Sequence, residues 1–237
     1  AIIGVSDRNN VVKGGKNMTR QQMKAMARAQ LGNQIFGNTW LIAVVVVVIQ
    51  TAISYLVNAV PGIGQIASLL LAGPVSFGVA AMFLKQTRTG EKMDIGDIFN
   101  GFRDDFSNTF LIGLMTFVFT FLWSLLFVIP GIVKSYSYSM AMYVKVDHPD
   151  YDWKQCIDES QRMMQGHKGE LFVLDLSFLG WMIIGACCCG VGTLWVNAYM
   201  AAAHSQFYEN LRRTEVMYSV ENTDPQFNAY NYSDQQN

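Results

Sequence analysis

Four polar residues, each set in a largely apolar stretch, are the strongest candidates for a functional site: Asp175, His204, Lys145 and Asn197. An isolated charge near the middle of a bilayer costs on the order of 2.5–3.5 kcal/mol, so such residues usually pair or serve a function. Asp175 could pair with Lys145 or with His204. The sequence therefore predicts one polar binding cluster, although Asp175 could instead reach the membrane interface or bond a neighbouring helix.

No pattern in the chain is typical of catalysis or of metal binding. The sequence contains no HExxH helix, no glycine-rich phosphate loop and no serine nucleophile elbow. Paired carboxylates at residues 104–105 and 158–159 lie in hydrophilic stretches, where a solvated helix face explains them. Cys156 and the run Cys187–Cys189 lack the paired spacing of a zinc site. We therefore expect a protein that is not an enzyme and that uses no metal or other cofactor.

Long apolar runs recur along the chain at the length needed to cross a membrane. A bilayer core about 30 Å thick needs about 20 helical residues at 1.5 Å per residue. We expect six such helices, over residues 40–60, 63–84, 109–129, 132–146, 171–189 and 191–208. In the second run, small residues every four positions, among them Ala72, predict a closely packed helix seam. The predicted fold class is an all-α polytopic membrane protein with about six transmembrane helices, arranged as three hairpins.

Two kinds of connector alternate between the apolar runs. Three short uncharged turns built on glycine join the runs in pairs: residues 60–64, 129–133 and 189–193. All of the 17 Lys and Arg residues except Lys134 lie in the longer connectors and the chain ends. With six spans these charges fall on one side of the membrane, which the positive-inside rule identifies as cytoplasmic. Both termini are therefore predicted to be cytoplasmic.

The charged connectors also contain short helical patterns. Thr19 begins a segment with a basic stripe, Asp94 can cap a helix with an aromatic face, and Asp152 can cap another. Such amphipathic helices either lie along the membrane surface or pack against the ends of the spans. We divide the chain into a polar N-terminal segment (1–18), a six-span membrane domain (19–211) and a disordered cytoplasmic tail (212–237).

Several motifs cluster in the second half of the chain. They are Pro130-Gly131-Ile132, Gly166-His167-Lys168, Leu176-Ser177-Phe178-Leu179-Gly180-Trp181, Gly190-Val191-Gly192-Thr193-Leu194-Trp195 and Phe207-Tyr208. With these motifs the chain resembles the bacterial integral membrane family of domain of unknown function nine-seven-five, over residues 19–211. Family members often have proline where Ala198 stands. The resemblance implies a multi-span protein of the bacterial cytoplasmic membrane, chiefly in Gram-positive bacteria, and it implies no reaction.

Two functions fit these features. The first is a non-enzymatic transport or permeation module for a small solute, lipid or peptide, because polar and proline-interrupted spans often line pathways. The second is an accessory membrane protein, such as a bacteriocin-immunity or membrane-assembly factor, because the chain has little extracytoplasmic mass and large cytoplasmic amphipathic surfaces. Expected partners are the lipid bilayer, a second copy of the chain, or another membrane or cytoplasmic protein. A net charge of −1 gives no reason to expect nucleic acid.

Overall fold

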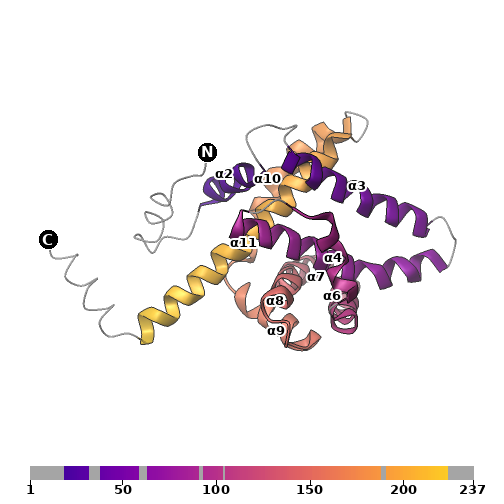
Figure 1. Ribbon diagram of the computed structural model, residues 1–237. Helices are drawn as coiled ribbons and strands as arrows, with labels where there is room; N and C mark the ends of the chain where they lie inside the picture. Colours follow the sequence, from indigo (N-terminus) through magenta and orange to yellow (C-terminus); the bar gives the residue numbers. More distant parts are fainter. Residues whose placement is uncertain are drawn as a thin grey trace.

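The computed structural model describes six stretches of the chain: residues 19–31, 38–58, 63–90, 93–103, 105–187 and 191–223. Every regular element within these stretches is a helix, as the all-α prediction requires. The helices are α2 (Arg20–Leu31), α3 (Asn38–Asn58), α4 (Ile63–Thr89), η1 (Ile95–Phe99), α5 (Asn100–Arg103), α6 (Phe106–Leu126), α7 (Val128–Tyr138), α8 (Ala141–Asp147), α9 (Trp153–Met163), α10 (Lys168–Cys187) and α11 (Val191–Thr223) (Figure 1). The predicted segment 1–18 and parts of two predicted turns, 60–62 and 189–190, lie outside the described residues.

Two helices in the described stretches are long and apolar enough to cross a membrane, namely Phe106–Leu126 and Lys168–Ala186. They correspond to the third and fifth predicted spans. The other four apolar runs also form helices, since α3 and α4 cover the first two, α7 with α8 the fourth, and α11 the sixth. The six-span arrangement therefore stays a prediction for these four runs.

The α6–α7 hairpin turns at Phe127, ahead of the predicted turn at Pro130-Gly131. Pro130 and Gly131 instead lie in the first turn of α7, where proline is tolerated because the first amides of a helix have no intrahelical acceptor. Gly131 faces α6 closely: a Cβ atom there would lie 2.1 Å from Ser124 Oγ. Pro130 and Gly131 therefore lie at the start of α7, and the absence of a side chain at Gly131 lets α7 pack closely against α6.

The fourth apolar run forms two helices, because α7 ends at Tyr138 and α8 begins at Ala141. Such a break leaves backbone groups without intrahelical partners. The hydroxyl of Ser160 in α9 donates to the carbonyl oxygen of Ser137 at 2.8 Å and accepts the amide of Met140 at 3.2 Å. Ser160 is fully buried, so α9 packs directly against the break and satisfies these groups.

The predicted helix starts in the charged connectors are confirmed. Asp152 and Gln155 form a reciprocal capping box at the start of α9, with bonds of 2.7 and 2.9 Å. Thr19 and Gln22 exchange the same kind of bonds before α2. Asp94 accepts a backbone amide at the start of η1, but the single helix expected there is a 3-10 turn followed by the short α5.

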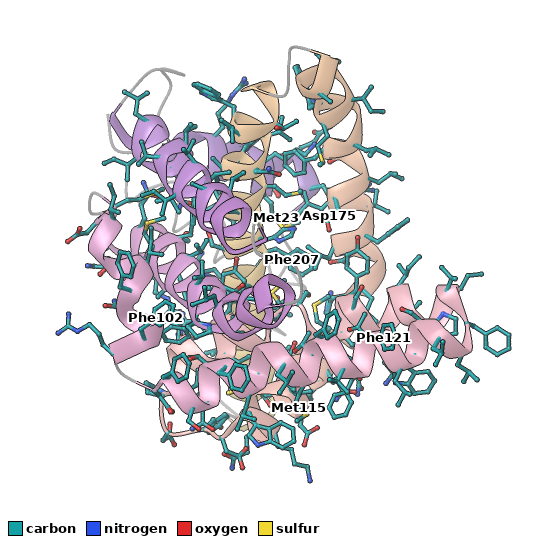
Figure 2. All side chains as sticks on the ribbon, turned by 90° about the vertical axis from the view of Figure 1, so that its right-hand side faces the viewer. Met23, Phe102, Met115, Phe121, Asp175 and Phe207 are labelled. Atoms are coloured by element: carbon teal, nitrogen blue, oxygen red, sulfur yellow. The ribbon has the colours of Figure 1, made fainter. Side chains whose placement is uncertain are left out.

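The three hairpins share a packed base and point their tips in different directions. In Figure 1 α3 and α4 extend to the right, and in Figure 2, turned by 90°, α6 extends to the right with Phe121 in its outer part. Exposure rises toward the α6–α7 tip, reaching 73% at Leu125 and 76% at Ile129. Fully buried side chains gather away from this tip: Met23, Phe83, Ile112, Met140, Phe178 and Phe207. The core therefore lies beside the charged connectors, and the apolar tips face outward.

An ion cluster at this base joins all three hairpins. Arg88, near the end of α4, lies 2.5 Å from both Asp147 of α8 and Glu209 of α11. The hydroxyl of Tyr208 donates to Asp147 at 2.8 Å, and Arg212 donates to Glu209 at 3.1 Å. Burial alone would raise the pKa of Asp147, but hydrogen bonds from Arg88 and Tyr208 hold that pKa below its usual value. We call these five residues the base cluster.

Helix α11 continues past residue 212, where the sequence predicts a disordered tail, and ends at Thr223. Its extension contacts α9, because Arg162 pairs with Glu215 at 3.0 Å as well as with Glu159 at 2.5 Å. The predicted tail boundary therefore differs from the structure over residues 212–223. Residues 224–237 lie outside the described part of the chain.

Two glycines of α4 make its closest helix contacts. A Cβ atom on Gly73 would lie 2.3 Å from the carbonyl oxygen of Thr109 in α6, and one on Gly78 would lie 2.0 Å from that of Ile98 in η1. Ala72, in the middle of the predicted small-residue ladder, is exposed. Ala80, another member of the ladder, is 4% exposed, so part of the ladder is buried and the closest contacts of α4, at Gly73 and Gly78, lie beside it.

This contact predicts opposite effects for two glycine substitutions. Alanine in a helix is normally about 1 kcal/mol more favourable than glycine. Gly78→Ala should nevertheless lower the free energy of unfolding by about 1–3 kcal/mol, because its methyl group overlaps the η1 backbone. Gly180→Ala in α10 has open space within 4 Å and serves as the control. Thermal melting in detergent measures both, and equal melting temperatures would contradict the contact.

Candidate functional site

Asp175 lies between two polar partners from neighbouring helices. His204 Nε2 of α11 is 2.6 Å from Asp175 Oδ1, and the hydroxyl of Tyr136 in α7 donates to Oδ2 at 3.1 Å. Both carboxylate oxygens are therefore bonded, and three helices meet at one acidic side chain, labelled in Figure 2. We call these residues the polar triad. The side chains of Asp175 and His204 keep 23% and 26% exposure, so the triad is only partly enclosed by the helices.

Apolar packing fixes the orientation of the triad. Leu171 and Phe178 lie about one turn before and after Asp175 along α10, and Leu174 directly precedes it. All three are buried, which fixes the face that α10 turns toward its neighbours. The ring of Phe172 packs edge-on against Tyr136, with 5.8 Å between ring centroids. Apolar surroundings strengthen hydrogen bonds among the polar groups that they enclose. The triad therefore holds a carboxylate, an imidazole and a phenol in a fixed arrangement that can bind a polar group by hydrogen bonds.

Lys145 does not join Asp175, contrary to the sequence prediction. Its ammonium group lies 2.7 Å from Asp105 Oδ2, 2.8 Å from the Pro149 carbonyl oxygen and 2.7 Å from that of Tyr151. These three acceptors match the three donors of an ammonium group. The antiparallel α6–α7–α8 arrangement places Lys145 opposite the start of α6, away from α10. Lys145 is 1% exposed and serves as a satisfied structural cation.

Asn197 lies apart from the triad, in the wall of a separate cavity. The cavity has a volume of about 370 Å³ and opens between α3, α4 and α11. Its lining residues are Val46, Val47, Thr51, Val79, Phe83, Asn197 and Ala201. The Thr51 hydroxyl donates to the Val47 carbonyl oxygen at 2.8 Å. The Asn197 amide is the main polar group left to meet a molecule in this cavity.

Tyr136 and the base cluster were not among the predicted site residues. Tyr136 belongs to the fourth apolar run, whose several tyrosines signal hydrogen-bonding capacity but not which partner each one takes. Arg88, Asp147 and Glu209 come from connectors or helix ends far apart in the sequence, so spacing alone does not associate them. Only their three-dimensional packing reveals the cluster.

The described residues contain no group of three His, Cys, Asp or Glu side chains able to hold a metal ion. Cys156 is fully buried in α9, and burial raises the pKa of its thiol to about 11, which disfavours the reactive thiolate. The cysteine run is described only at Cys187, the last residue of α10. Residues 188–189 lie outside the described part.

These features define a class: a protein that is all-helical in its described part, where two helices are apolar enough to cross a membrane and a polar triad lies between helices. Comparison with protein families then identifies the chain as a member of the family described as protein of unknown function (DUF975), matched over residues 18–134 and 125–215. The family resemblance seen in the sequence is thereby confirmed. Comparisons with curated proteins and with solved structures found no match.

The triad geometry predicts which side chains are energetically coupled. A double-mutant cycle of Asp175→Ala and His204→Ala should give a coupling of about 1–3 kcal/mol, because the hydrogen bond between the two side chains can be lost only once. Asp175→Ala combined with Lys145→Met should be additive, since their side chains bond different partners. Unfolding in detergent measures both cycles. Coupling to Lys145 without coupling to His204 would contradict the structure.

Proposed function

We propose that this chain is an integral membrane protein with six spans that acts as a non-enzymatic permeation or transport module for a small solute. The observation that carries the proposal is the cavity between α3, α4 and α11, with the Asn197 amide in its wall. A transport module needs a place to hold its solute within apolar helices, and this cavity provides one.

The proposed topology places the charged base in the cytoplasm and the hairpin tips across the bilayer. Helices α6 and α10 support it by length and hydropathy. The outward α10 residues Trp181, Ile183 and Ile184 are 58–64% exposed, which suits contact with lipid chains. The distribution of Lys and Arg in the sequence supports cytoplasmic termini.

The cavity favours a small solute over a peptide or a whole lipid. Ligand sites usually enclose about 300–1,000 Å³, and a volume of about 370 Å³ lies at the lower end of that range. Valine, alanine and phenylalanine side chains form most of the wall, so the solute needs a largely apolar body. One amide can donate and accept, so the solute needs one or two hydrogen-bonding groups at most near Asn197.

An accessory role is the second candidate, and one exposed aromatic group favours it. Phe99 of η1 is 48% exposed at the charged base, beside Phe102, whose ring centroid lies 6.4 Å away. A partner protein could bury this aromatic surface. This role requires no solute pathway, so the two candidates differ in what they predict for the cavity.

A flux assay in reconstituted vesicles separates the candidates. Wild-type vesicles should pass small uncharged solutes such as urea, glycerol or short alcohols faster than empty vesicles. Ala201→Phe fills the cavity and should reduce that excess flux at least tenfold, whereas Ala25→Phe on the exposed side of α2 should not. Melting temperatures confirm folding of both variants. Wild-type flux equal to that of empty vesicles, or equal flux in both variants, would remove the transport proposal in favour of the accessory role.

A further inference from the structure

The cavity between α3, α4 and α11 is open at one end and closed at the other. Thr51, in its wall toward the hairpin tips, is exposed, whereas Phe83, in its wall toward the base, is 1% exposed. Residue numbers rise toward the base in both α4 and α11, because each helix runs from its hairpin turn to the base cluster. A solute that enters at the open end therefore needs a route past Phe83 to reach the base.

Beyond Phe83, polar side chains line the contact between α4 and α11. One turn further toward the base, the hydroxyl oxygens of Thr87 and Ser205 share a hydrogen bond of 2.8 Å. Arg88 and Glu209 of the base cluster follow. Ser205 and Glu209 are 0% and 2% exposed, so this polar line lies inside the protein. We call the stretch from Phe83 to the base cluster the polar strip.

Gln30 of α2 fits into this strip and bonds both of its helices. Its amide nitrogen donates to the Phe83 carbonyl oxygen at 3.2 Å and to Gln86 Oε1 at 3.0 Å. Its amide oxygen accepts from Gln206 of α11 at 3.0 Å. The Phe83 carbonyl oxygen also accepts the Thr87 hydroxyl at 2.8 Å, so Gln30 lies beside the closed end of the cavity. Both N–H groups and the oxygen of the Gln30 amide are thus bonded within the strip.

These bonds close the strip in a form that a solute can replace. Gln86 and Gln206 are 6% and 4% exposed, and buried amides are costly without partners. When Gln30 leaves, both amides need new partners, which water or a hydrogen-bonding solute supplies. Apolar side chains would fill the same space without leaving polar groups to satisfy, so packing alone does not require this strip. Ahead of the base cluster it offers amides and hydroxyls, which match a neutral solute that donates and accepts hydrogen bonds.

We propose that Gln30 is the inner gate of the cavity, and that its displacement lets a small neutral amide or alcohol pass along the polar strip to the base. The proposal rests on the proposed transport function and adds the residue that controls it. Gln30 directly precedes the last residue of α2, so it moves with the end of that helix. The rest of α2 stays in place, because Met23 is in the core (Figure 2) and the Tyr199 hydroxyl donates to the Lys24 carbonyl oxygen at 2.9 Å.

A buried thiol in the polar strip reports the state of the gate without reference to transport. Ser205→Cys introduces that thiol, and its reaction with a small charged methanethiosulfonate is followed by mass spectrometry of the full chain in lipid vesicles. Gln30→Ala removes the gate, and Gln30→Met removes only its amide. Gln21→Ala, at an exposed position of the same helix, is the matched control. Cys156, which is fully buried in α9, reports general loosening of the fold.

In the Ser205→Cys background, both Gln30 variants should react about tenfold faster, because hydrogen bonds that hold the closed state are lost. Gln21→Ala should react at the rate of its parent, and Cys156 should react equally slowly in every variant. An unchanged rate in both Gln30 variants would overturn the proposal, as would an equal acceleration at Cys156.

Urea flux separates this proposal from the transport proposal. With Ser205 retained, Gln30→Ala vesicles should pass urea about tenfold faster than wild-type vesicles, whereas structural damage alone gives no such gain. Faster thiol reaction with urea flux equal to that of empty vesicles in every variant would refute the transport proposal, while Gln30 would remain the residue that closes the strip. Wild-type flux above that of empty vesicles, without acceleration at the thiol, would overturn only the gate.

Discussion

The base cluster is the constraint on which the remaining structure depends. The three hairpins diverge toward their tips, so they must be joined where their charged ends meet (Figures 1 and 2). Arg88 lies there between two carboxylates, and the side chains of Asp147 and Glu209 are only 10% and 3% exposed. Without the guanidinium each would become a buried charge without its main partner, which is strongly destabilising. One arginine of α4 therefore fixes α8 and α11 relative to the first hairpin.

Helix α11 connects that constraint to every candidate site. Its residues Asn197, Tyr199, His204 and Glu209 contribute in turn to the cavity wall, the contact with α2, the polar triad and the base cluster. Because a helix is stiff over this length, a shift of α11 at the base cluster would also displace the cavity wall, the contact with α2 and the polar triad. The cavity wall and α2 are in this way positioned by the same helix.

The sequence predicted the helices and part of the site, for identifiable reasons. Apolar runs fix helix positions in a chain of this hydropathy, and capping residues such as Asp152 fix their starts. Asp175 and His204 meet because adjacent helices of one hairpin carry them at similar depth. Lys145 was misplaced because its partner depends on the α6–α7 turn at Phe127 and on the break that follows α7. Such features arise from packing between helices, which sequence periodicity does not encode.

The central claim is that apolar hairpin tips enter the bilayer while the charged base stays outside its hydrocarbon core. Tryptophan fluorescence tests it directly, in vesicles whose lipids carry bromine on the acyl chains. Trp123 and Trp181 lie in the two span-length helices and are 39% and 64% exposed, whereas Trp153 begins α9 at the base. In single-tryptophan variants, brominated lipid should quench Trp123 and Trp181 strongly and Trp153 weakly. Quenching of Trp153 as strong as that of Trp181, or no quenching of Trp123 and Trp181, would contradict the account.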